Sequence, residues 1–547
     1  MTCSAQRAIG RCVLSALVSA ALAGCGSNNP STIPYASAGD ASWAQDAISV
    51  PDSSSDYSVA PDTISSDTTP APDTATSDAP VAQDMAQDIV VLADGAGDGM
   101  VEPDAAKPDA SVSEVPATDA ASSDRTTSDG ATSDGATMPD AEPAPDLATA
   151  LSAIQRVVDP QVPAADSTTL ASDNAAFAFD AYKKLIATNT NLIFSPASIS
   201  IALAMTYAGA AGTTASEMAQ ALHFSLPPAQ LHPAFNALDQ ALASRGQGQL
   251  GADGGPMQLH IVNAVWAERT YTFKTAFLDI LAANYGAGIN LLDFVSAPDP
   301  SRLTINIWVA DQTENKIQDL LPEGSIDSST RLVLTNAVYF NAAWKVPFSP
   351  NETRDGQFAL LDGSSVSAKF MYGYLDKIPT VQGTNFVAVS LPYADDRLSL
   401  VVVLPDAGKF SQVESSLDAS SLGTLVAGLT SQMGYVIIPR FRVETGSDLV
   451  SLLKALGMKS AFSIGSADFS GMDGTHSLYI SDVIHKAFID VAEKGTEAAA
   501  ATGVVVGNAS VPPPPLLRAD RPFLYFLRDQ PTGAILFMGR VLDPSKN

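Results

Sequence analysis

The stretch of sequence that decides the fold is residues 493–506, EKGTEAAAATGVVV. Every second residue from Thr496 onward is small or β-branched and uncharged, whereas Glu497 falls on the other face of a strand. One face of such a strand is therefore fit to be buried in a sheet. The chain then runs into four prolines, 512–515, which cannot extend a central strand. The segment can be an exposed loop, and it can also become a strand.

Four further motifs accompany this segment in a fixed order along the chain. They are NLIFSPASI at 191–199, LVLTNAVYF at 332–340, DRPFLY at 520–525 and LFMGRV at 536–541. Together with residues 493–506, these motifs resemble the serpin family of protease inhibitors. In that family they form the entry to a buried central helix, a strand of the main sheet, the C-terminal signature and the last strand. The resemblance covers residues 166–547.

The resemblance implies an α+β fold with three β-sheets, about nine helices and an exposed reactive-centre loop. It also implies a suicide mechanism. A target serine protease attacks the loop and forms an acyl-enzyme, and the cleaved loop then inserts into the main sheet as a new strand and traps the protease. The small, uncharged face beginning at Thr496 is what such insertion requires, because burying it costs little.

The family pattern assigns positions in the loop of this chain. The hinge comprises Glu493, Gly495, Thr496, Ala498, Ala499, Ala500 and Ala501. Counting forward in the family's register puts the reactive bond between Ala509 and Ser510. Val506 and Asn508 are the alternatives if the register differs. A small, uncharged residue favours elastase-like or subtilisin-like serine proteases, because a trypsin-like pocket would keep an unpaired carboxylate.

Five side chains match the family's region where strands of the main sheet separate to admit the loop. They are Ser195, Ser198, Asn336, His485 and Trp344. Each has an ordinary alternative as a hydrogen-bonded core polar residue or a core aromatic, and the sequence leaves both open. Residues 227–257 hold a single arginine and no lysine. No polyanionic cofactor is expected there, although glycosaminoglycan-activated relatives bind one in this region.

Three functions are compatible with these observations. The first is protease inhibition, the second is a non-inhibitory serpin that acts as a binding or chaperone-like protein, and the third is a lipid-anchored hydrolase. The small hinge residues favour the first, since non-inhibitory relatives carry bulky, charged or proline residues there. The sequence has no metalloprotease, nucleophile-elbow or nucleotide-binding motif. We expect no enzyme activity, no cofactor and no metal.

The charge of the 547-residue chain is concentrated in one segment. The net charge is −29: residues 1–25 carry +2, residues 26–165 carry −21 and residues 166–547 carry −10. Such an acidic chain is not expected to bind nucleic acid. All three cysteines, Cys3, Cys12 and Cys25, lie in the first 25 residues, which excludes a disulfide framework or a cysteine nucleophile further along. We expect a monomer.

The N-terminus has the pattern of an export signal. Arg7 and Arg11 precede an apolar run too short to remain as a membrane span, and the run ends in LAGC at 22–25. This ending resembles the lipobox of bacterial lipoproteins, which implies a signal peptide over 1–24 and a lipidated Cys25. An ordinary secretory signal is the alternative. The resemblance implies an exported, membrane-anchored protein that faces the periplasm or the cell surface.

Residues 25–165 are predicted to be a disordered linker between this anchor and a folded domain over 166–547. The segment after Cys25 has three aromatic residues and is built from Asp, Ala, Ser, Thr and Pro. It cannot bury enough apolar surface to offset the entropy of ordering.

Within the domain, apolar periodicity predicts both helices and strands. The predicted helices lie at 173–186, entered through Asp173, and at 198–211, 217–222 and 448–456. The predicted strands lie at 259–267, 331–340, 386–391, 398–404, 434–441, 485–491, 523–527 and 534–541.

Overall fold

The computed structural model describes residues 147–496 and 515–546 of the chain. These two ranges contain ten α-helices and sixteen β-strands, in agreement with an α+β fold. The predicted signal peptide, Cys25, hinge positions 498–501 and the reactive bond between Ala509 and Ser510 lie outside the described residues.

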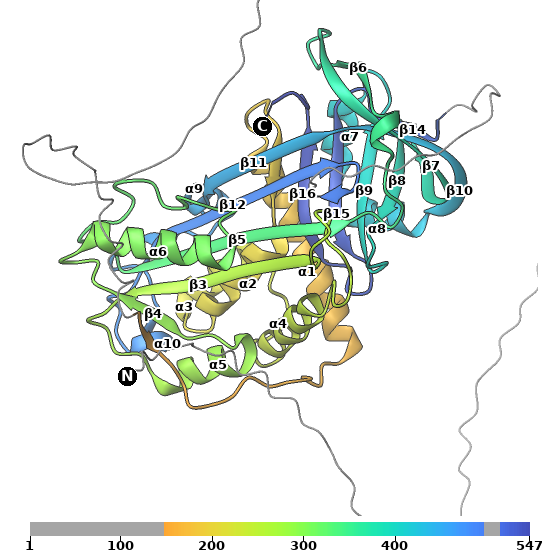
Figure 1. The fold of residues 1–547 in the computed structure, drawn as a ribbon. Helices are drawn as coiled ribbons and strands as arrows, with labels where there is room; N and C mark the ends of the chain where they lie inside the picture. The colour runs from red at the N-terminus through yellow and green to blue at the C-terminus, as the bar shows by residue number, and fades with distance from the viewer. Residues whose placement is uncertain (1–146, 497–514, 547) are drawn as a thin grey trace, which may run out of the picture. The chain divides into compact units, whose positions relative to one another are not determined.

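The main sheet has seven strands in the order β1-β4-β3-β5-β13-β12-β11. Their bounds are Ala148–Ala150 (β1), Ile289–Leu292 (β4), Gln258–Glu268 (β3), Leu332–Ala343 (β5), Gly495–Thr496 (β13), Ile480–Ala492 (β12) and Phe441–Asp448 (β11). The central strands β5 and β12 are parallel, whereas β3 and β11 pair antiparallel to them on either side. In Figure 1, helix α6 (Pro298–Gln312) crosses one face of this sheet, and helix α2 (Pro196–Tyr207) lies behind the other.

Strand β5 is mostly apolar because both of its faces are covered; its polar residues are Thr335, Asn336 and Asn341. Leu334, Val338 and Phe340 pack into the core that contains α2. Val333 and Ala337 pack into the core beneath α6. Since successive side chains of a strand point to opposite faces, a strand buried on both sides is apolar at most positions and does not alternate. The strand predicted here from the sequence is confirmed.

A second sheet of nine strands completes the β-structure of the described residues. Its strands are Leu517–Arg518 (β14), Thr430–Pro439 (β10), Ser365–Gly383 (β7), Phe386–Pro392 (β8), Leu398–Pro405 (β9), Phe523–Asp529 (β15), Ile535–Val541 (β16), Leu192–Phe194 (β2) and Arg354–Ala359 (β6). The 19-residue strand β7 pairs with β6 and β10 and, at its far end, with β8. Because β7 joins these ladders, the described strands form two continuous sheets where the resemblance implied three.

The remaining helices pack around the two sheets (Figure 1). They are Ala164–Leu185 (α1), Gly212–Ala221 (α3), Pro228–Ala243 (α4), Thr275–Tyr285 (α5), Phe410–Ser416 (α7), Ala419–Ala427 (α8), Val450–Ala455 (α9) and Ser470–Asp473 (α10), with short 3₁₀ turns at Pro350–Glu352 and Ser460–Phe462. Helices α4, α5 and α6 are not among the predicted elements, because apolar side chains on one face of a helix give a weaker signal than the fully buried α2.

All four predicted helices differ from the structure in their bounds. Helix α2 spans Pro196–Tyr207 where 198–211 was predicted, and α3 spans Gly212–Ala221 where 217–222 was predicted. Helix α1 begins at Ala164 and not at Asp173, because Pro163 precedes the first turn and Asp166 within that turn suits the positive end of the helix dipole. Asp448 ends strand β11, so the helix predicted from that residue begins later, at Val450.

Residues 147–165 are also part of the folded domain, so the domain boundary predicted at residue 166 is too late. Strand β1 pairs antiparallel with β4 at the edge of the main sheet. Further along, the Arg156 guanidinium donates to Asn236 (2.9 Å) and to Asp239 (2.6 Å), both on α4. Composition does not reveal an edge strand of this kind, because its partners are distant in the sequence.

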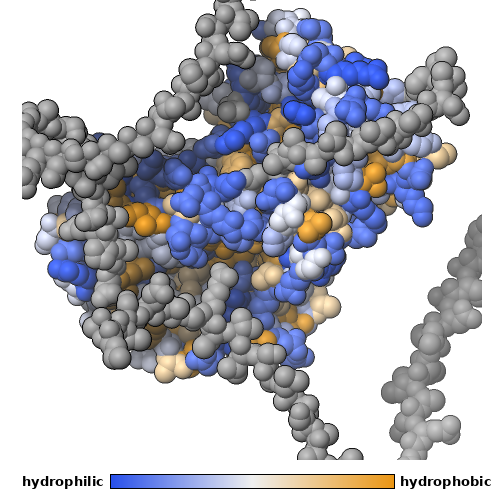
Figure 2. All heavy atoms as spheres, viewed as in Figure 1, coloured by the Kyte–Doolittle hydropathy of each residue, from blue (hydrophilic) through white to orange (hydrophobic). Residues whose placement is uncertain are grey.

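The surface of the domain is mixed in character. Figure 2 shows hydrophilic and hydrophobic residues interspersed on the face in view, as is usual for a folded protein surface. Within residues 147–496 and 515–546, no helix combines the length and the apolar character needed to cross a bilayer.

Candidate functional site

The first hinge residues lie between the two central strands of the main sheet. The chain leaves β12, turns at Glu493 and Lys494, and returns as β13. Thr496 of β13 lies opposite Val491 of β12 on one side and Ala342 of β5 on the other. Beyond β13, strands β5 and β12 pair directly with each other. At this end of the sheet, the two residues of β13 therefore separate β5 from β12. Along their next part, β5 and β12 are bonded directly to each other.

The turn before β13 is held by a buried carboxylate. Nε and Nη2 of Arg440 approach one carboxylate oxygen of Glu493 at 2.7 and 2.6 Å, and the Thr353 hydroxyl donates to the same oxygen. Burial alone would raise the pKa of Glu493, but the hydrogen bonds from Arg440 and Thr353 outweigh it and lower this pKa.. Glu493 is therefore charged at neutral pH and ties the turn to two neighbouring segments.

Trp344 anchors the same turn through the backbone. Its indole N–H donates to the carbonyl of Ala492 and its backbone N–H donates to the carbonyl of Lys494, both at 2.8 Å. The backbone N–H of Phe348 donates to the carbonyl of Glu493, also at 2.8 Å. The structure thus places Trp344 beside the turn that leads from β12 into β13.

Gly495 is required by close backbone contact. A Cβ atom at this position would lie 2.0 Å from the carbonyl oxygen of Ala342 and 2.8 Å from Cα of Ala343. Both atoms belong to the backbone of β5, so neither can give way as a side chain would. Only glycine allows the hinge to lie this close to β5.

Thr496 is buried among aromatic side chains. Its hydroxyl hydrogen-bonds to the Tyr393 hydroxyl at 2.7 Å. The Tyr393 ring stacks on Trp344, with centroids 4.4 Å apart, and meets Phe340 edge-on. Burial raises the pKa of Tyr393 far above its ordinary value, so its hydroxyl stays protonated. The side chains that meet here, Tyr393, Trp344 and Phe340, are uncharged, so among the described residues this pocket suits a small hydroxylated side chain.

A second group of polar residues crosses the closed part of the sheet. We call it the polar cluster; its members are Ser195, Ser198, Asn263, Asn336 and His485. Asn336 lies opposite His485 on β12 and opposite Asn263 on β3, so three adjacent strands contribute at one level. The Asn336 amide donates to Ser198 and Asn263 and accepts from the His485 ring. The cluster therefore links β5 directly to β12 and to the start of α2.

His485 is a neutral structural residue in this cluster. Its Nε2 accepts a hydrogen bond from the backbone N–H of Ser195 at 3.1 Å, so Nδ1 carries the proton that is donated to Asn336. Burial lowers the pKa of His485 to about 3. The hydroxyl of Ser195 accepts from the backbone N–H of Ser198 at 3.4 Å and does not meet the imidazole. The two residues are not arranged as a nucleophile and its base.

Asn263 is the member of the polar cluster that the sequence analysis missed. It lies on β3, within the predicted strand 259–267. An asparagine between apolar neighbours of a mostly apolar strand was the available signal, because a buried amide needs partners nearby. Which strand supplied those partners was not visible from the sequence.

The described residues contain no group of three or more His, Cys, Asp or Glu side chains placed to hold a metal ion. The described site is a main sheet whose central strands are separated at one end. Trp344 and Glu493 hold the turn at that end, and the polar cluster holds the adjoining parts of β5 and β12 together.

Comparison with known proteins is consistent with this geometry. The family model described as Serpin (serine protease inhibitor) matches residues 172–544. An uncharacterized serpin-like protein of Thermococcus kodakarensis is 38% identical over 372 residues, covering 68% of this chain and 84% of the relative. The leukocyte elastase inhibitor of Bos taurus is 38% identical over 386 residues, covering 69% and 99% of the two chains.

Solved structures with the same fold include tengpin, a thermophilic serpin in its native state. It has a TM-score of 0.64 and 27% identity, and covers 73% of this chain and 99% of its own. Human thyroxine-binding globulin in complex with thyroxine has a TM-score of 0.62 and 27% identity, and covers 70% and 100%. The chain belongs to the serpin family.

Proposed function

We propose that this protein inhibits a serine protease by suicide trapping. The protease cleaves the loop that follows the hinge, and the cleaved loop inserts between β5 and β12. The observation that carries the proposal is the position of β13, whose two residues lie between these strands and antiparallel to both. A strand continuing β13 would keep this orientation and bond to both neighbours.

The register of β13 specifies where later residues would lie after insertion. Continuing from Thr496 opposite Ala342, residue Thr502 comes level with Asn336 on β5 and with His485 on β12. Asn336 and His485 are themselves opposite each other, so both ladders assign Thr502 to the same level. Insertion would separate this pair, and the hydroxyl of Thr502 would arrive between them as a new hydrogen-bonding partner.

The same register assigns the inward face of the inserted strand. The residues that share a face with Thr496 are Ala498, Ala500, Thr502, Val504 and Val506. They would lie on the side of β5 from which Val338 and Phe340 enter the core of α2. None of them carries a charge, so their burial has no ionic desolvation cost.

We propose that the polar cluster holds β5 and β12 together and that insertion must break its hydrogen bonds. Its side chains hold β5 to β12 in the closed part of the sheet. At the other end, Trp344 and Glu493 hold the hinge where insertion begins. The serine hydroxyls and amides can exchange partners when the strands move apart, so opening need not leave buried polar groups unsatisfied.

The target is proposed to be an elastase-like or subtilisin-like serine protease, with cleavage between Ala509 and Ser510. We expect rapid covalent trapping of such enzymes and little inhibition of trypsin, because Ala509 offers no cation to a trypsin-like pocket. The relatives named leukocyte elastase inhibitor support this assignment. The measurement is a set of second-order inhibition rates together with the mass of the released C-terminal peptide.

The matched variant is Ala509→Arg. It should raise the second-order rate of trypsin inhibition and lower that of elastase inhibition. A released peptide that begins at a residue other than Ser510 would show that the reactive bond is at another position. Faster inhibition of trypsin than of elastase by the unmodified protein would contradict the specificity.

We further propose that the protein is exported and anchored through a lipid on Cys25. A single thiol at the end of a signal-like apolar run supports this. Residues 26–146 would then form the tether, and a flexible coil of about 120 residues spans roughly 60 Å. Such a tether would present the inhibitory domain well clear of the membrane surface, on the periplasmic or the outer side.

Cys25→Ser is expected to abolish lipid attachment and to remove the protein from the membrane fraction or block its processing. The measurement is incorporation of a labelled fatty acid, together with membrane fractionation. Cys12→Ser, in the apolar run, is the control and should leave both unchanged. Equal labelling of the Cys25→Ser variant would contradict the anchor without affecting the proposed inhibition.

A further inference from the structure

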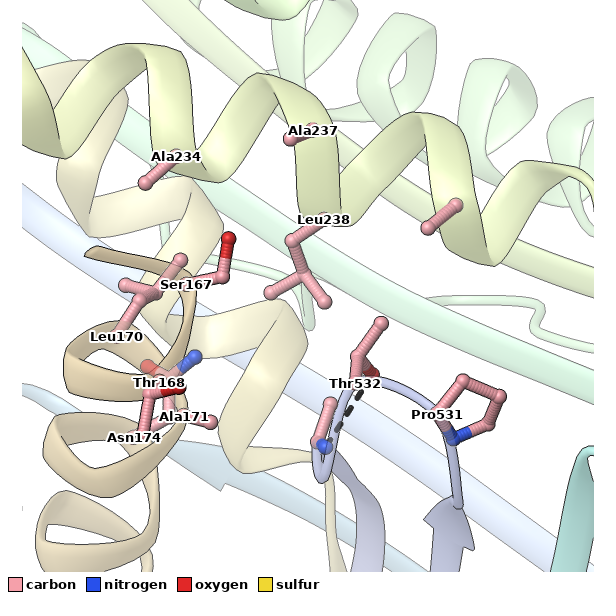
Figure 3. Close-up of a pocket in the computed structure, with 12 residues that line it drawn as sticks. Ser167, Thr168, Leu170, Ala171, Asn174, Ala234, Ala237, Leu238, Pro531 and Thr532 are labelled. Atoms are coloured by element: carbon pink, nitrogen blue, oxygen red, sulfur yellow. Dashed lines mark hydrogen bonds between the residues drawn. The ribbon is translucent and has the colours of Figure 1, made fainter. Parts of the chain in front are cut away.

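A cavity lies apart from the hinge and the polar cluster, between helices α1 and α4 and the turn that joins β15 to β16. Its volume is about 330 Å³. Figure 3 shows α1 and α4 facing each other across it, with the turn at Pro531 and Thr532 closing a third side. This volume is at the lower end of the range for small-molecule sites, so an occupant would be small.

The cavity has a polar rim and an apolar floor. Ser167, Thr168 and Pro531 are exposed at the rim. Leu170 and Leu238 are buried on opposing helices and line the interior, together with alanines of both helices. Small-molecule sites usually combine such an apolar lining with one or two placed polar groups.

One polar side chain in this lining has no hydrogen-bond partner among the described residues. Asn174 on α1 is 3% exposed, and neither its Oδ1 nor its Nδ2 has a hydrogen-bond partner among the described residues. Buried side-chain amides are nearly always satisfied. On α4, the equally buried Asn236 donates to the carbonyl of Val157 and accepts from Arg156. The Asn174 amide therefore has unused capacity both to donate and to accept.

A cationic group lies near the turn of the same cavity. The Nε atom of Arg528 on β15 is buried without a hydrogen-bond partner among the described residues. A Cβ atom added to Gly533, in the turn, would lie 3.9 Å from Nη2 of Arg528 and 3.7 Å from Cβ of Ala171. Ala171 lines the cavity, so the guanidinium lies close to it. Burial lowers the pKa of Arg528, and the neighbouring Asp529 partly opposes this effect. A second cation would be disfavoured here.

We propose that this cavity is a binding site for a small neutral molecule with a short apolar body and a carboxamide-type head group. The apolar body would lie between Leu170 and Leu238. The head group would pair with the Asn174 amide, because a carboxamide offers an acceptor and a donor side by side and complements both free atoms.

Calorimetric titration of the full chain with hexanamide tests the proposal, with hexylammonium as the probe of equal chain length. Hexanamide is expected to bind and to raise the melting temperature by about 1–3 °C at ten times its dissociation constant. Hexylammonium should do neither, because it cannot accept a hydrogen bond and would meet the positive charge of Arg528. Failure of hexanamide to bind, or equal binding of the two probes, would overturn the proposal.

Two variants locate the binding. Asn174→Leu removes the unpaired amide, so it should raise the melting temperature of the ligand-free protein and abolish the response to hexanamide. Ala237→Phe fills the cavity from α4 and should also abolish binding. A lower ligand-free melting temperature for Asn174→Leu, or retained binding in both variants, would contradict the site. Protease trapping should be unchanged in both, which separates this test from the proposed inhibitory function.

Discussion

Thr496→Arg is expected to convert the protein from an inhibitor of its target protease into a substrate that is cleaved and released. Thr496 lies between β5 and β12, and its hydroxyl meets the uncharged Tyr393, which packs against Trp344 and Phe340. An unpaired buried cation costs several kcal/mol. Since about 1.4 kcal/mol is a factor of ten, covalent trapping relative to cleavage should fall about a hundredfold or more. Denaturing gels distinguish the covalent complex from the cleaved product.

Two controls separate this effect from misfolding. Lys494→Arg places an equally long cation in the turn before β13, where the backbone carbonyl makes the contact with Trp344. Thr496→Ser keeps a hydroxyl next to Tyr393. Both should trap protease nearly as well as the unmodified protein. Covalent complexes formed by Thr496→Arg with unchanged efficiency would show that trapping does not need residue 496 to lie between β5 and β12.

Cutting the loop within residues 503–511 is expected to raise the melting temperature sharply. Once free, the loop can continue β13 between β5 and β12, and it should form on the order of ten more backbone hydrogen bonds than it breaks. At about 1 kcal/mol for each bond, the stabilisation is about 10 kcal/mol. For a domain of this size, such a gain corresponds to a rise of roughly 10 °C or more. Differential scanning calorimetry before and after limited proteolysis measures it.

The same cut in the Thr496→Arg variant provides the control. If the rise comes from insertion, the buried cation should suppress it, whereas a rise caused only by relief of a strained loop would persist. An unchanged or lower melting temperature of the cut, unmodified protein would favour the second function that the sequence left open. The protein would then be a non-inhibitory serpin whose loop stays outside the sheet.

The family, the α+β class and the position of the hinge could be predicted from the sequence because they depend on local patterns. Strand β5 is buried on both faces and therefore has a predominantly apolar sequence. The hinge alternates small, uncharged residues with a period of two, which is visible without any knowledge of the neighbouring strands. The motifs around Ser195 and Asn336 could also be recognised, although their hydrogen bonds could not.

Only the tertiary structure decided how these segments meet. The β13 residues Gly495 and Thr496 lie between two strands that are more than a hundred residues apart in the chain, and backbone contact with β5 decides that the first of them is glycine. Asn263 joins the polar cluster because β3 pairs with β5 in one particular register. The Asn174 amide can be identified as unpaired among the described residues only once α4 and the β15–β16 turn are seen to lie around it without bonding to it. The sequence determined which faces can be buried, because periodicity is a local property. The three-dimensional fold determined which groups face one another, because pairing and register depend on contacts between distant segments.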